Sequence, residues 1–427
     1  MMSALPAVMA KHPESRSTHK RRRFVFLSAA CALGLTGCAG VFALPNVLYL
    51  TIGANSDQTI DAELIEDIDN RLKLLESGFR QIYPSTRFQF AAYPETGIKP
   101  AMARRNRAGL GPDLLLINGD TAKQLVNAGL VDPFPLTPEL ANLFNPGDLD
   151  RLRLPDGDLA GLPVIIHSQV ACFNRKRLPT PPSTLQELLD ASAKGHNIGL
   201  SVELSTLFWT AGSVGATDAW SRVVMGKRLS RADVNSIENW TAWLQDASDQ
   251  QRITFYPNQA SALTEFSAGR LDWISCSSIN LPRLRKSLGA SLGVSNLPSG
   301  PGGSASPINR LRVLALGRNS SRQGRERALA FSRFSVNPLV QRGMTLGSQI
   351  LLPANRFVKV PVQSSVTLQA MSDSQKAGLR TAELANVLHV DDPRLDRAQT
   401  LITQLVFGEI TPQGAATALI ALMEAKP

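Results

Sequence analysis

The sequence predicts an α/β protein with two domains. The chain has 427 residues, which is enough for two hydrophobic cores, and its 43% apolar and 19% charged residues are ordinary for a folded globular protein. Short apolar runs alternate with amphipathic helical stretches, and the run 113–117 shows no polar alternation at all. Unbroken runs of this kind are typical of parallel strands that helices cover on both faces.

The first part of the chain repeats the order strand, turn, helix, which predicts right-handed crossover units. The expected strands are 47–53, 87–92 and 113–117. Between the first two, apolar residues recur at spacings of three and four from Leu64 to Ile82, and Pro84 ends the helix that they predict. After the third strand, Asp120 is expected to cap a helix that closes at Gly129.

The stretch 161–190 lies in the middle of the chain and is expected to cross between the domains. Its apolar, β-branched run is interrupted only by His167, Ser168 and Gln169. Prolines end the extended part, and Thr184 is expected to cap the next helix, with Glu187 completing a capping box. Two extended elements joined by a small polar island indicate a crossing point between two domains.

The same alternation continues to the end of the chain, and no repeat of fixed period is present. Ser205 is expected to cap an apolar helix that carries Phe208 and Trp209, and Thr411 to cap the last helix, with Pro412 in its first turn. The remaining expected elements are helices 185–193, 239–246, 260–268 and 325–334, strands 197–202, 271–276 and 311–316, a flexible loop 298–307, and a helical tail from about 366.

The N-terminal segment is typical of a protein that is exported. A basic run ending at Arg23 precedes an apolar run, 24–35, that is too short for a comfortable membrane span. The following Leu-Thr-Gly-Cys resembles the bacterial lipobox, which predicts that 1–37 is a lipoprotein signal peptide and that Cys38 is lipidated. The alternative is cleavage near Ala43, which would discard Cys38. The lipobox implies a periplasmic or cell-surface lipoprotein of a bacterium, anchored in a membrane.

Export changes the interpretation of the charge and of the cysteines. The signal segment holds six basic residues and one acidic residue, so it accounts for five of the formal net charge of +10. No basic stripe with interleaved aromatic residues follows, so nucleic acid is not an expected partner. Cys172 and Cys276 remain in the mature chain. They either form a disulfide, which would close a loop of roughly 100 residues, or stay as two buried thiols.

Motifs in a specific order resemble the extracytoplasmic solute-binding proteins of ABC importers, within the sugar-binding family 1 that includes maltose-binding protein. The resemblance covers nearly the whole mature chain. It is carried by the Pro-Asp-led strand and helix of 112–134, the Gly-hydrophobic-Pro strand from Gly161 with Asn174, Arg175 and Lys176 after it, the segment from Phe266, the helix from Ala328, the Leu-Pro turn at Leu351 and the closing helix from Phe407.

The resemblance implies a two-lobed, type II periplasmic-binding-protein fold with a ligand cleft between the lobes and closure on binding. Lobe I is expected to hold 38–165 and about 277–320. Lobe II is expected to hold about 166–276 and about 321–427, with a helical C-terminal tail. The implied partners are a small solute, most simply a sugar or glycoside, and the transmembrane subunits of an ABC permease. A monomer without enzymatic activity, cofactor or metal is expected.

Loops at the carboxyl ends of the strands are the expected ligand-binding positions. The candidate residues are Asn55, Ser56, Asp57, Asn118, His167, Ser168, Trp209, Ser277, Ser278 and Asn309. Trp209 could stack on a sugar ring, and core packing is the alternative; for His167 the alternative is a satisfied core histidine. Ile279 stands where the family commonly has tryptophan, and only 6% of the residues are aromatic, which favours a small solute.

Other functions have less support in the sequence. No nucleophile elbow, zinc-protease motif or phosphate-binding loop is present, which disfavours an enzyme. A ferric-ion carrier would need clustered oxygen donors, and the tyrosines at positions 49, 83, 93 and 256 are dispersed. An anionic solute could be bound through Arg310 or Arg356. A scaffold or sensor without a transport role is the last alternative.

Overall fold

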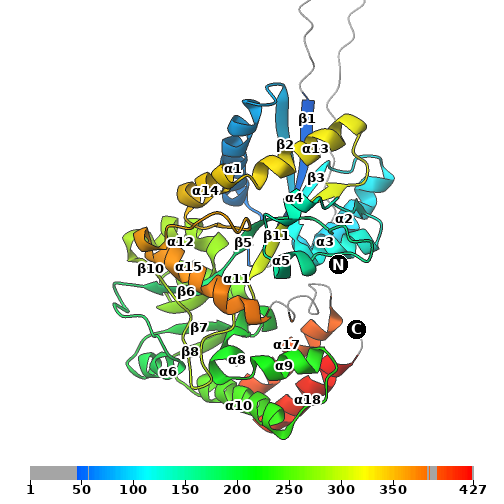
Figure 1. The fold of residues 1–427 in the computed structure, drawn as a ribbon. Helices are drawn as coiled ribbons and strands as arrows, with labels where there is room; N and C mark the ends of the chain where they lie inside the picture. The colour runs from blue at the N-terminus through cyan, green and yellow to red at the C-terminus, as the bar shows by residue number, and fades with distance from the viewer. Residues whose placement is uncertain (1–45, 56, 382–383, 385–391, 426–427) are drawn as a thin grey trace, which may run out of the picture. The chain divides into compact units, whose positions relative to one another are not determined.

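The computed structural model describes residues 46–55, 57–381, 384 and 392–425. The chain forms two α/β lobes, each built around one β-sheet (Figure 1). This confirms the predicted fold class. The predicted signal peptide and Cys38 lie outside the described residues, as does Ser56. Within the described ranges, no helix has the length and apolar character needed to cross a membrane.

The first lobe contains a sheet of seven strands in the order β12-β5-β11-β3-β1-β2, with β4 pairing with β11. Its strands are β1 (Asn46–Ala54), β2 (Thr86–Pro94), β3 (Leu114–Asn118), β4 (Val131–Asp132), β5 (Leu162–His167), β11 (Arg310–Gly317) and β12 (Leu352–Pro353). β1 is parallel to both β2 and β3, whereas β11 is antiparallel to β3 and β5. The carboxyl ends of β1, β2 and β3 therefore meet the start of β11 at one edge of the sheet.

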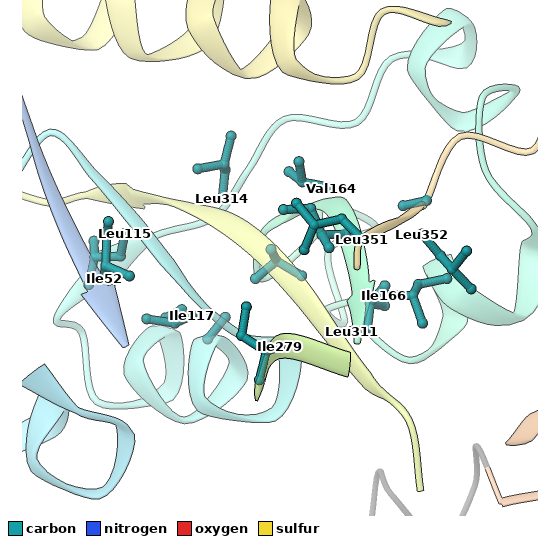
Figure 2. Packing of buried hydrophobic residues seen from close by; sticks show 14 of the residues in the cluster. Ile52, Leu115, Ile117, Val164, Ile166, Ile279, Leu311, Leu314, Leu351 and Leu352 are labelled. Atoms are coloured by element: carbon teal, nitrogen blue, oxygen red, sulfur yellow. The ribbon is translucent and has the colours of Figure 1, made fainter. Parts of the chain in front are cut away.

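Apolar side chains from both faces of this sheet form the first core. The helices of the lobe are α1 (Ala62–Arg80), α2 (Ile98–Arg107), α3 (Gly119–Asn127), α4 (Pro138–Ala141), α5 (Pro146–Asp150), α13 (Arg322–Ser335) and α14 (Pro338–Ser348). Phe79 of α1 meets Phe331 of α13 edge to face, with ring centroids 5.4 Å apart. Figure 2 shows Ile117 of β3 beside Ile279, which lies directly after β9 (Trp273–Ser277), and both belong to one core cluster. The Ile279 side chain is therefore part of the hydrophobic core and is not exposed to a ligand.

The second lobe contains five strands in the order β10-β6-β9-β7-β8. These are β6 (Gln169–Asn174), β7 (Ile198–Ser201), β8 (Ile253–Tyr256), β9 (Trp273–Ser277) and β10 (Leu292–Ser295). Its helices are α6 (Leu185–Ala193), α7 (Leu204–Leu207), α8 (Trp209–Val214), α9 (Thr217–Val224), α10 (Arg231–Ser248), α11 (Gln259–Ser267), α12 (Leu281–Leu288), α15 (Val366–Ala377), α17 (Pro393–Val406) and α18 (Pro412–Glu424). Short 3-10 turns are η1 (Glu95–Gly97), η2 (Ser278–Asn280), η3 (Gly289–Ser291), η4 (Val362–Ser364) and η5 (Gly378–Thr381).

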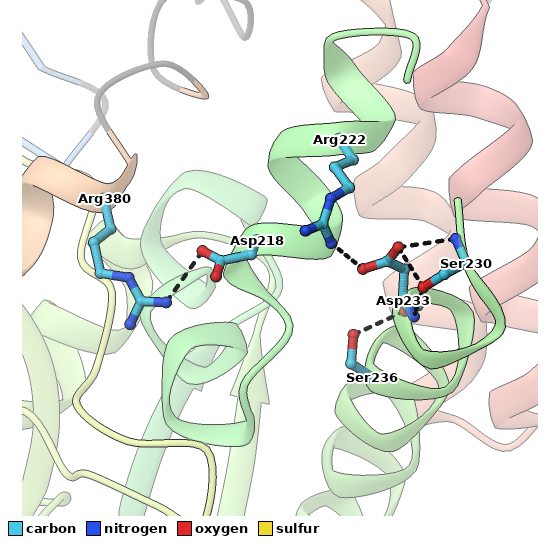
Figure 3. A network of polar contacts seen from close by, with 6 residues as sticks. All are labelled: Asp218, Arg222, Ser230, Asp233, Ser236 and Arg380. Atoms are coloured by element: carbon cyan, nitrogen blue, oxygen red, sulfur yellow. Dashed lines mark hydrogen bonds and ion pairs between the residues drawn. The ribbon is translucent and has the colours of Figure 1, made fainter. Parts of the chain in front are cut away.

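Polar contacts hold the start of α10 and the end of η5 in the second lobe. The Ser230 side chain caps α10 and forms a capping box with Asp233, which also pairs with Arg222 of α9 (Figure 3). Arg380 of η5 donates to Asp218 at 3.1 Å. These contacts tie the C-terminal segment to α9, so that the last helices complete the second core.

Three segments join the sheets, and they form a hinge region. The chain passes from the first sheet to the second at Ser168, whose N–H donates to Ser278 Oγ at 3.2 Å, and Ser278 N–H donates to Ser168 O at 2.8 Å. It returns through 296–309 and passes again to the second lobe through 354–365. The Asn309 side chain accepts from Gln169 N–H at 3.0 Å and donates to Ser374 O at 2.8 Å. Hydrogen bonds between crossing segments thus define the hinge.

Several expectations about the elements are wrong in detail. β10 lies in the second sheet, although 277–320 was expected in lobe I, and α13 packs on β1, although 321–427 was expected in lobe II. Ser205 lies inside α7, whose N-cap is Glu203, and Asp120 lies in the first turn of α3, whose N-cap position is Asn118. The caps by Thr184 and Thr411 are confirmed.

Candidate ligand-binding cleft

A cleft of 240 Å³ lies where the carboxyl ends of the first-lobe strands face the second lobe. From the first lobe it is lined by loops that follow β1, β2 and β3 and by the start of β11; from the second lobe, by the start of α7 and by α17. The hydrogen-bonding side chains that line it are Asn55, Glu95, Thr96, Asn118, Asp120, Arg151, Glu203, Ser205, Asn309, Arg310, Asp396 and Gln399. No aromatic side chain lines this cleft within the described part of the chain.

A buried arginine organises the first-lobe wall of the cleft. Arg312 of β11 is 3% exposed and pairs with Glu95, which is 5% exposed, at 3.1 Å. Its guanidinium also donates to Gly53 O at 2.6 Å and to Leu116 O at 2.8 Å. Glu95 accepts the Asn118 backbone N–H at 2.6 Å. One side chain therefore holds the ends of β1, β2 and β3 together, because its donors reach all three.

The same arginine decides how two cleft amides are oriented. Arg312 donates to Asn118 Oδ1 at 2.9 Å, and a guanidinium has no acceptor, so Asn118 Nδ2 must face away from it. Asn118 Nδ2 donates to Asn55 Oδ1 at 3.1 Å. Asn55 Nδ2 is then left buried without a hydrogen-bond partner among the described residues. These two hydrogen bonds fix the orientation of both amides, so that Asn55 Nδ2 is left as a hydrogen-bond donor for a solute.

Gly53 permits this packing. A Cβ built on Gly53 would lie 1.8 Å from Glu95 Oε2, so any side chain would displace the carboxylate from Arg312. The glycine is therefore required for the close approach of η1 to the end of β1.

Arg310 is a half-buried cation that lines the cleft. It pairs with His167 in the β5–β11 ladder and lines both the cleft and a smaller inner chamber of 30 Å³. Its guanidinium makes no hydrogen bond or ion pair with any residue that the structure describes, although its charge acts on Asp57 and Glu203. Five donors therefore remain for a bound solute.

Burial shifts the ionisation of three groups around Arg310. Burial raises the pKa of the Asp57 carboxyl, and the charge of Arg310 offsets part of the rise. Burial also raises the pKa of Glu203, which the Gln259 backbone N–H opposes by donating to the carboxylate at 2.9 Å. Burial lowers the pKa of His167 well below its usual value, and the charge of Arg312 lowers it further. His167 is therefore neutral at pH 7.

The neutral state of His167 gives the stability of the protein a pH dependence. Unfolded histidine titrates near pH 6.5, so below this pH the unfolded chain binds a proton that the folded chain does not. The free energy of unfolding should therefore fall as the pH drops below about 6.5, by at most about 1.4 kcal/mol per pH unit from this group. Urea unfolding of wild type and His167→Asn between pH 5 and pH 8 measures it.

His167→Asn should lack this pH-dependent part of the stability. His196→Asn, at a half-buried histidine of the second lobe that lies 3.9 Å from Asp272, is the comparison variant. Identical pH slopes for wild type and His167→Asn would contradict a buried neutral His167.

The structure brings some of the predicted residues to the cleft and leaves others out. Asn55, Asn118 and Asn309 line the cleft, and Asp57, His167 and Ser277 line the inner chamber. Ser168 and Ser278 are fully buried in the hinge and line neither space in this structure, so their contact with a ligand stays a prediction. Asn309 reaches the cleft, but its amide is engaged in the hinge.

Trp209 is a core residue, as its alternative interpretation held. It is 0% exposed and packs against Trp273, with ring centroids 6.0 Å apart. In this structure Trp209 lines neither space, because α8 turns its side chain toward the second sheet, and stacking on a sugar stays a prediction.

Several cleft residues were not predicted from the sequence as sugar contacts. Glu95, Arg151, Glu203 and Asp396 line the cleft, and Arg310 was considered only for an anionic solute. Glu95 and Glu203 each come shortly after a strand, and this was the available indication, since the predicted sites follow other strands in the same way. Asp396 lies on a helix from the far end of the chain, and no local pattern marks it.

Cys172 and Cys276 form a disulfide between the neighbouring strands β6 and β9. Of the two alternatives from the sequence, a disulfide or two buried thiols, the structure has the disulfide. Both strands belong to the second sheet, so the bridge does not cross the hinge.

Two α/β lobes with crossing segments and a polar cleft between them define a two-lobed solute-binding protein. The model of the family described as bacterial extracellular solute-binding protein matches residues 85–369. The chain therefore belongs to the bacterial extracellular solute-binding protein family.

Solved structures of this kind share the fold. The GacH receptor of Streptomyces glaucescens GLA.O, solved without ligand and with acarbose or an acarbose homolog, is 16% identical over 90% of this chain and 100% of its own, with a TM-score of 0.70. The maltose-maltodextrin binding protein of Alicyclobacillus acidocaldarius is 18% identical, covering 89% and 100%, with a TM-score of 0.64.

A solute-binding protein of Thermotoga lettingae TMO, bound with alpha-D-tagatose, is 15% identical, covering 89% and 99%, with a TM-score of 0.63. A comparison with curated protein sequences found no match.

Proposed function

We propose that this protein captures a small carbohydrate-like solute in the cleft and delivers it to the membrane permease of an ABC importer. The observation that carries the proposal is the lining of the cleft by amide, carboxylate and guanidinium groups at the carboxyl ends of strands. Such groups match the alternating donors and acceptors of a polyol. Family membership and the carbohydrates bound by the similar solved proteins support it.

The size and composition of the cleft favour a small solute. A volume of 240 Å³ without aromatic lining offers no stacking surface for the successive rings of a long oligosaccharide. Specificity would then rest on hydrogen bonds.

An anionic solute is the second candidate, because Arg310 and Arg151 both line the cleft. Four carboxylates line the same space, and those of Asp120, Glu203 and Asp396, unlike that of Glu95, are not paired with Arg312 and would repel a polyanion. A neutral polyol fits the mixed charges better. A ferric ion is less favoured, because the described residues contain no cluster of three or more histidine, cysteine or acidic side chains that could hold a metal.

The proposal extends to the cellular role. The protein would be an exported lipoprotein, anchored through Cys38, that acts as a monomeric binding protein rather than an enzyme. Thermal-shift titration of the mature protein with monosaccharides, disaccharides, glycosides and inorganic phosphate tests the ligand class. Mass spectrometry of the same preparation identifies copurified solute and the mature N-terminus. Stabilisation by phosphate alone, or turnover of any sugar, would contradict the proposal.

Replacing Arg310 with alanine is expected to weaken sugar binding by about 10- to 100-fold, because a hydrogen bond to a charged group contributes about 1.5–3 kcal/mol. The unliganded protein should lose less than about 2 kcal/mol of unfolding free energy, since the guanidinium makes no hydrogen bond in it and acts on Asp57 and Glu203 only through its charge. Calorimetric titration and urea unfolding measure the two effects.

Arg322→Ala is the matched control, because the Arg322 side chain is 94% exposed on α13, outside the cleft. Unchanged affinity in Arg310→Ala together with a clear loss of stability would show that Arg310 is structural.

A further inference from the structure

An inner chamber of 30 Å³ lies beside the cleft, and the proposed function leaves it unexplained. Ser205, Ile308 and Arg310 line both spaces, so the two are neighbours. The chamber exceeds the roughly 10–15 Å³ that one water molecule needs. It can therefore hold a few non-hydrogen atoms and no more.

Three side chains of the chamber each bury one oxygen that has no hydrogen-bond partner in the described part of the chain. These oxygens are Asp57 Oδ1, Gln169 Oε1 and Gln259 Oε1. Gln169 is 7% exposed and Gln259 is 3% exposed. A buried polar atom without a partner destabilises a folded protein, so three around one small space indicate an occupant.

The contacts of Gln169 and Gln259 decide that their two unpaired oxygens are acceptors, and Asp57 Oδ1 is an acceptor when this carboxyl is ionised. Gln169 Nε2 donates to Thr206 O at 2.6 Å, and Gln259 Nε2 donates to Ser275 O. A backbone carbonyl only accepts, so neither amide can be turned around without losing its bond. Asp57 Oδ2 accepts from Asn280 Nδ2 at 2.8 Å, which leaves Oδ1 for the chamber.

The occupant must donate hydrogen bonds. Arg310 and Asp57 both line the chamber, and their opposite charges offset each other, which favours a neutral donor over a cation. A hydroxyl donates only once, so three acceptors call for more than one donor. A pair of adjacent hydroxyls, or one hydroxyl with a retained water molecule, meets both conditions.

We propose that the inner chamber is a subsite that receives a hydroxyl-bearing end of the solute, which donates to Asp57, Gln169 and Gln259. This inference rests on the proposed function. Asp57 follows β1 in the first lobe, whereas Gln169 begins β6 and Gln259 begins α11 in the second. One polyol end therefore bridges both lobes, and its hydroxyls contribute to closure as well as to specificity.

The first experiment uses deoxy sugars. Wild type is titrated calorimetrically with D-glucose, D-galactose, D-mannose, maltose and trehalose, and then with each monodeoxy derivative of the sugar that binds most tightly. Removal of the hydroxyl that enters the chamber should weaken binding at least 100-fold, because the acceptors are left unpaired. Losses within threefold at every position would overturn the proposal.

The second experiment tests whether Asp57 acts on that same hydroxyl. Asp57→Asn keeps the shape and places an amide at the chamber, and it should weaken binding of the parent sugar at least 30-fold. The loss caused by the sensitive deoxy derivative should then nearly vanish in the variant, because both changes remove one contact. Additive losses would mean that Asp57 acts only on the fold. Asp69→Asn, on α1 and ion-paired with Lys73, is the control.

A third experiment separates this inference from the proposed function. Crystals of the ligand-free protein are soaked in rubidium chloride, and the chamber is inspected for density. Ordered water within hydrogen-bond distance of at least two of the three oxygens supports a subsite for donors, even if no sugar in the panel binds and the proposed function fails. An anomalous rubidium peak, or the Arg310 guanidinium on these oxygens, would overturn the subsite.

Discussion

Replacement of Arg312 with methionine should lower the free energy of unfolding by about 3–5 kcal/mol, because it leaves Glu95 as a buried charge without its partner. Arg312 is 3% exposed and bonds to Glu95, Asn118, Gly53 O and Leu116 O. Methionine fills similar volume but supplies none of these donors. Urea unfolding followed by circular dichroism measures the loss.

A second variant separates the charge from the hydrogen bonds. In Arg312→Met with Glu95→Gln the buried carboxylate is absent, so part of the lost stability should return. Arg322→Met, on a side chain that is 94% exposed, is the matched control and should change the free energy of unfolding by less than about 0.5 kcal/mol. A loss below about 1 kcal/mol in Arg312→Met would contradict the role of Arg312 as the organiser of this wall.

Binding should weaken in the double variant even where the protein is folded. Without Arg312, Asn118 and Asn55 lose the donor that sets their orientation, so Asn55 Nδ2 is no longer held as a donor. Affinity for the sugar found by titration measures this effect separately from stability.

Replacement of Cys172 with serine should lower the free energy of unfolding by about 4–5 kcal/mol, the chain-entropy value for a loop of this length. The bridge joins residues 104 apart in sequence, and its loss frees the unfolded chain more than it alters the folded one. Solute affinity should stay nearly unchanged, because β6 and β9 lie in the same sheet and the bridge does not span the hinge.

Wild-type protein treated with a reductant is the control for the disulfide experiment, and it should lose the same stability as Cys172→Ser. A large loss of affinity in Cys172→Ser at a temperature where the protein is folded would mean that the bridge also positions the cleft. Equal stability of oxidised and reduced wild type would contradict a stabilising bridge.

Local patterns in the sequence predicted most of the first lobe. Apolar runs marked β1, β2 and β3, and the spacing of Leu64, Leu72 and Phe79 marked α1, because these patterns repeat at the period of the element they build. The strands β4, β8, β10 and β12 were not predicted. β4 and β12 have two residues each, too few for any period, and β8 and β10 have four, so only their pairing with neighbouring strands identifies them.

The candidate site could be predicted only in part. Asn55 and Asn118 follow strands directly, and their positions were predicted because the carboxyl ends of parallel strands share an edge. Trp209 begins α8 and Ser278 directly follows β9, yet the Trp209 side chain is buried in the core of the second lobe and Ser278 is buried in the hinge. The direction of a side chain at such a point depends on the elements packed around it, and no local pattern encodes that.

The sequence by itself determined the α/β class, the order of most strands and helices, the resemblance to solute-binding proteins and the two cysteines able to pair. Only the tertiary structure decided which polar groups meet. Arg312 lies 217 residues from Glu95, and Asn280 lies 223 residues from Asp57, yet each pair shares a hydrogen bond. Contacts over such separations arise when the sheets and crossings pack, because burial brings distant charges and amides to one small space where each must find a partner.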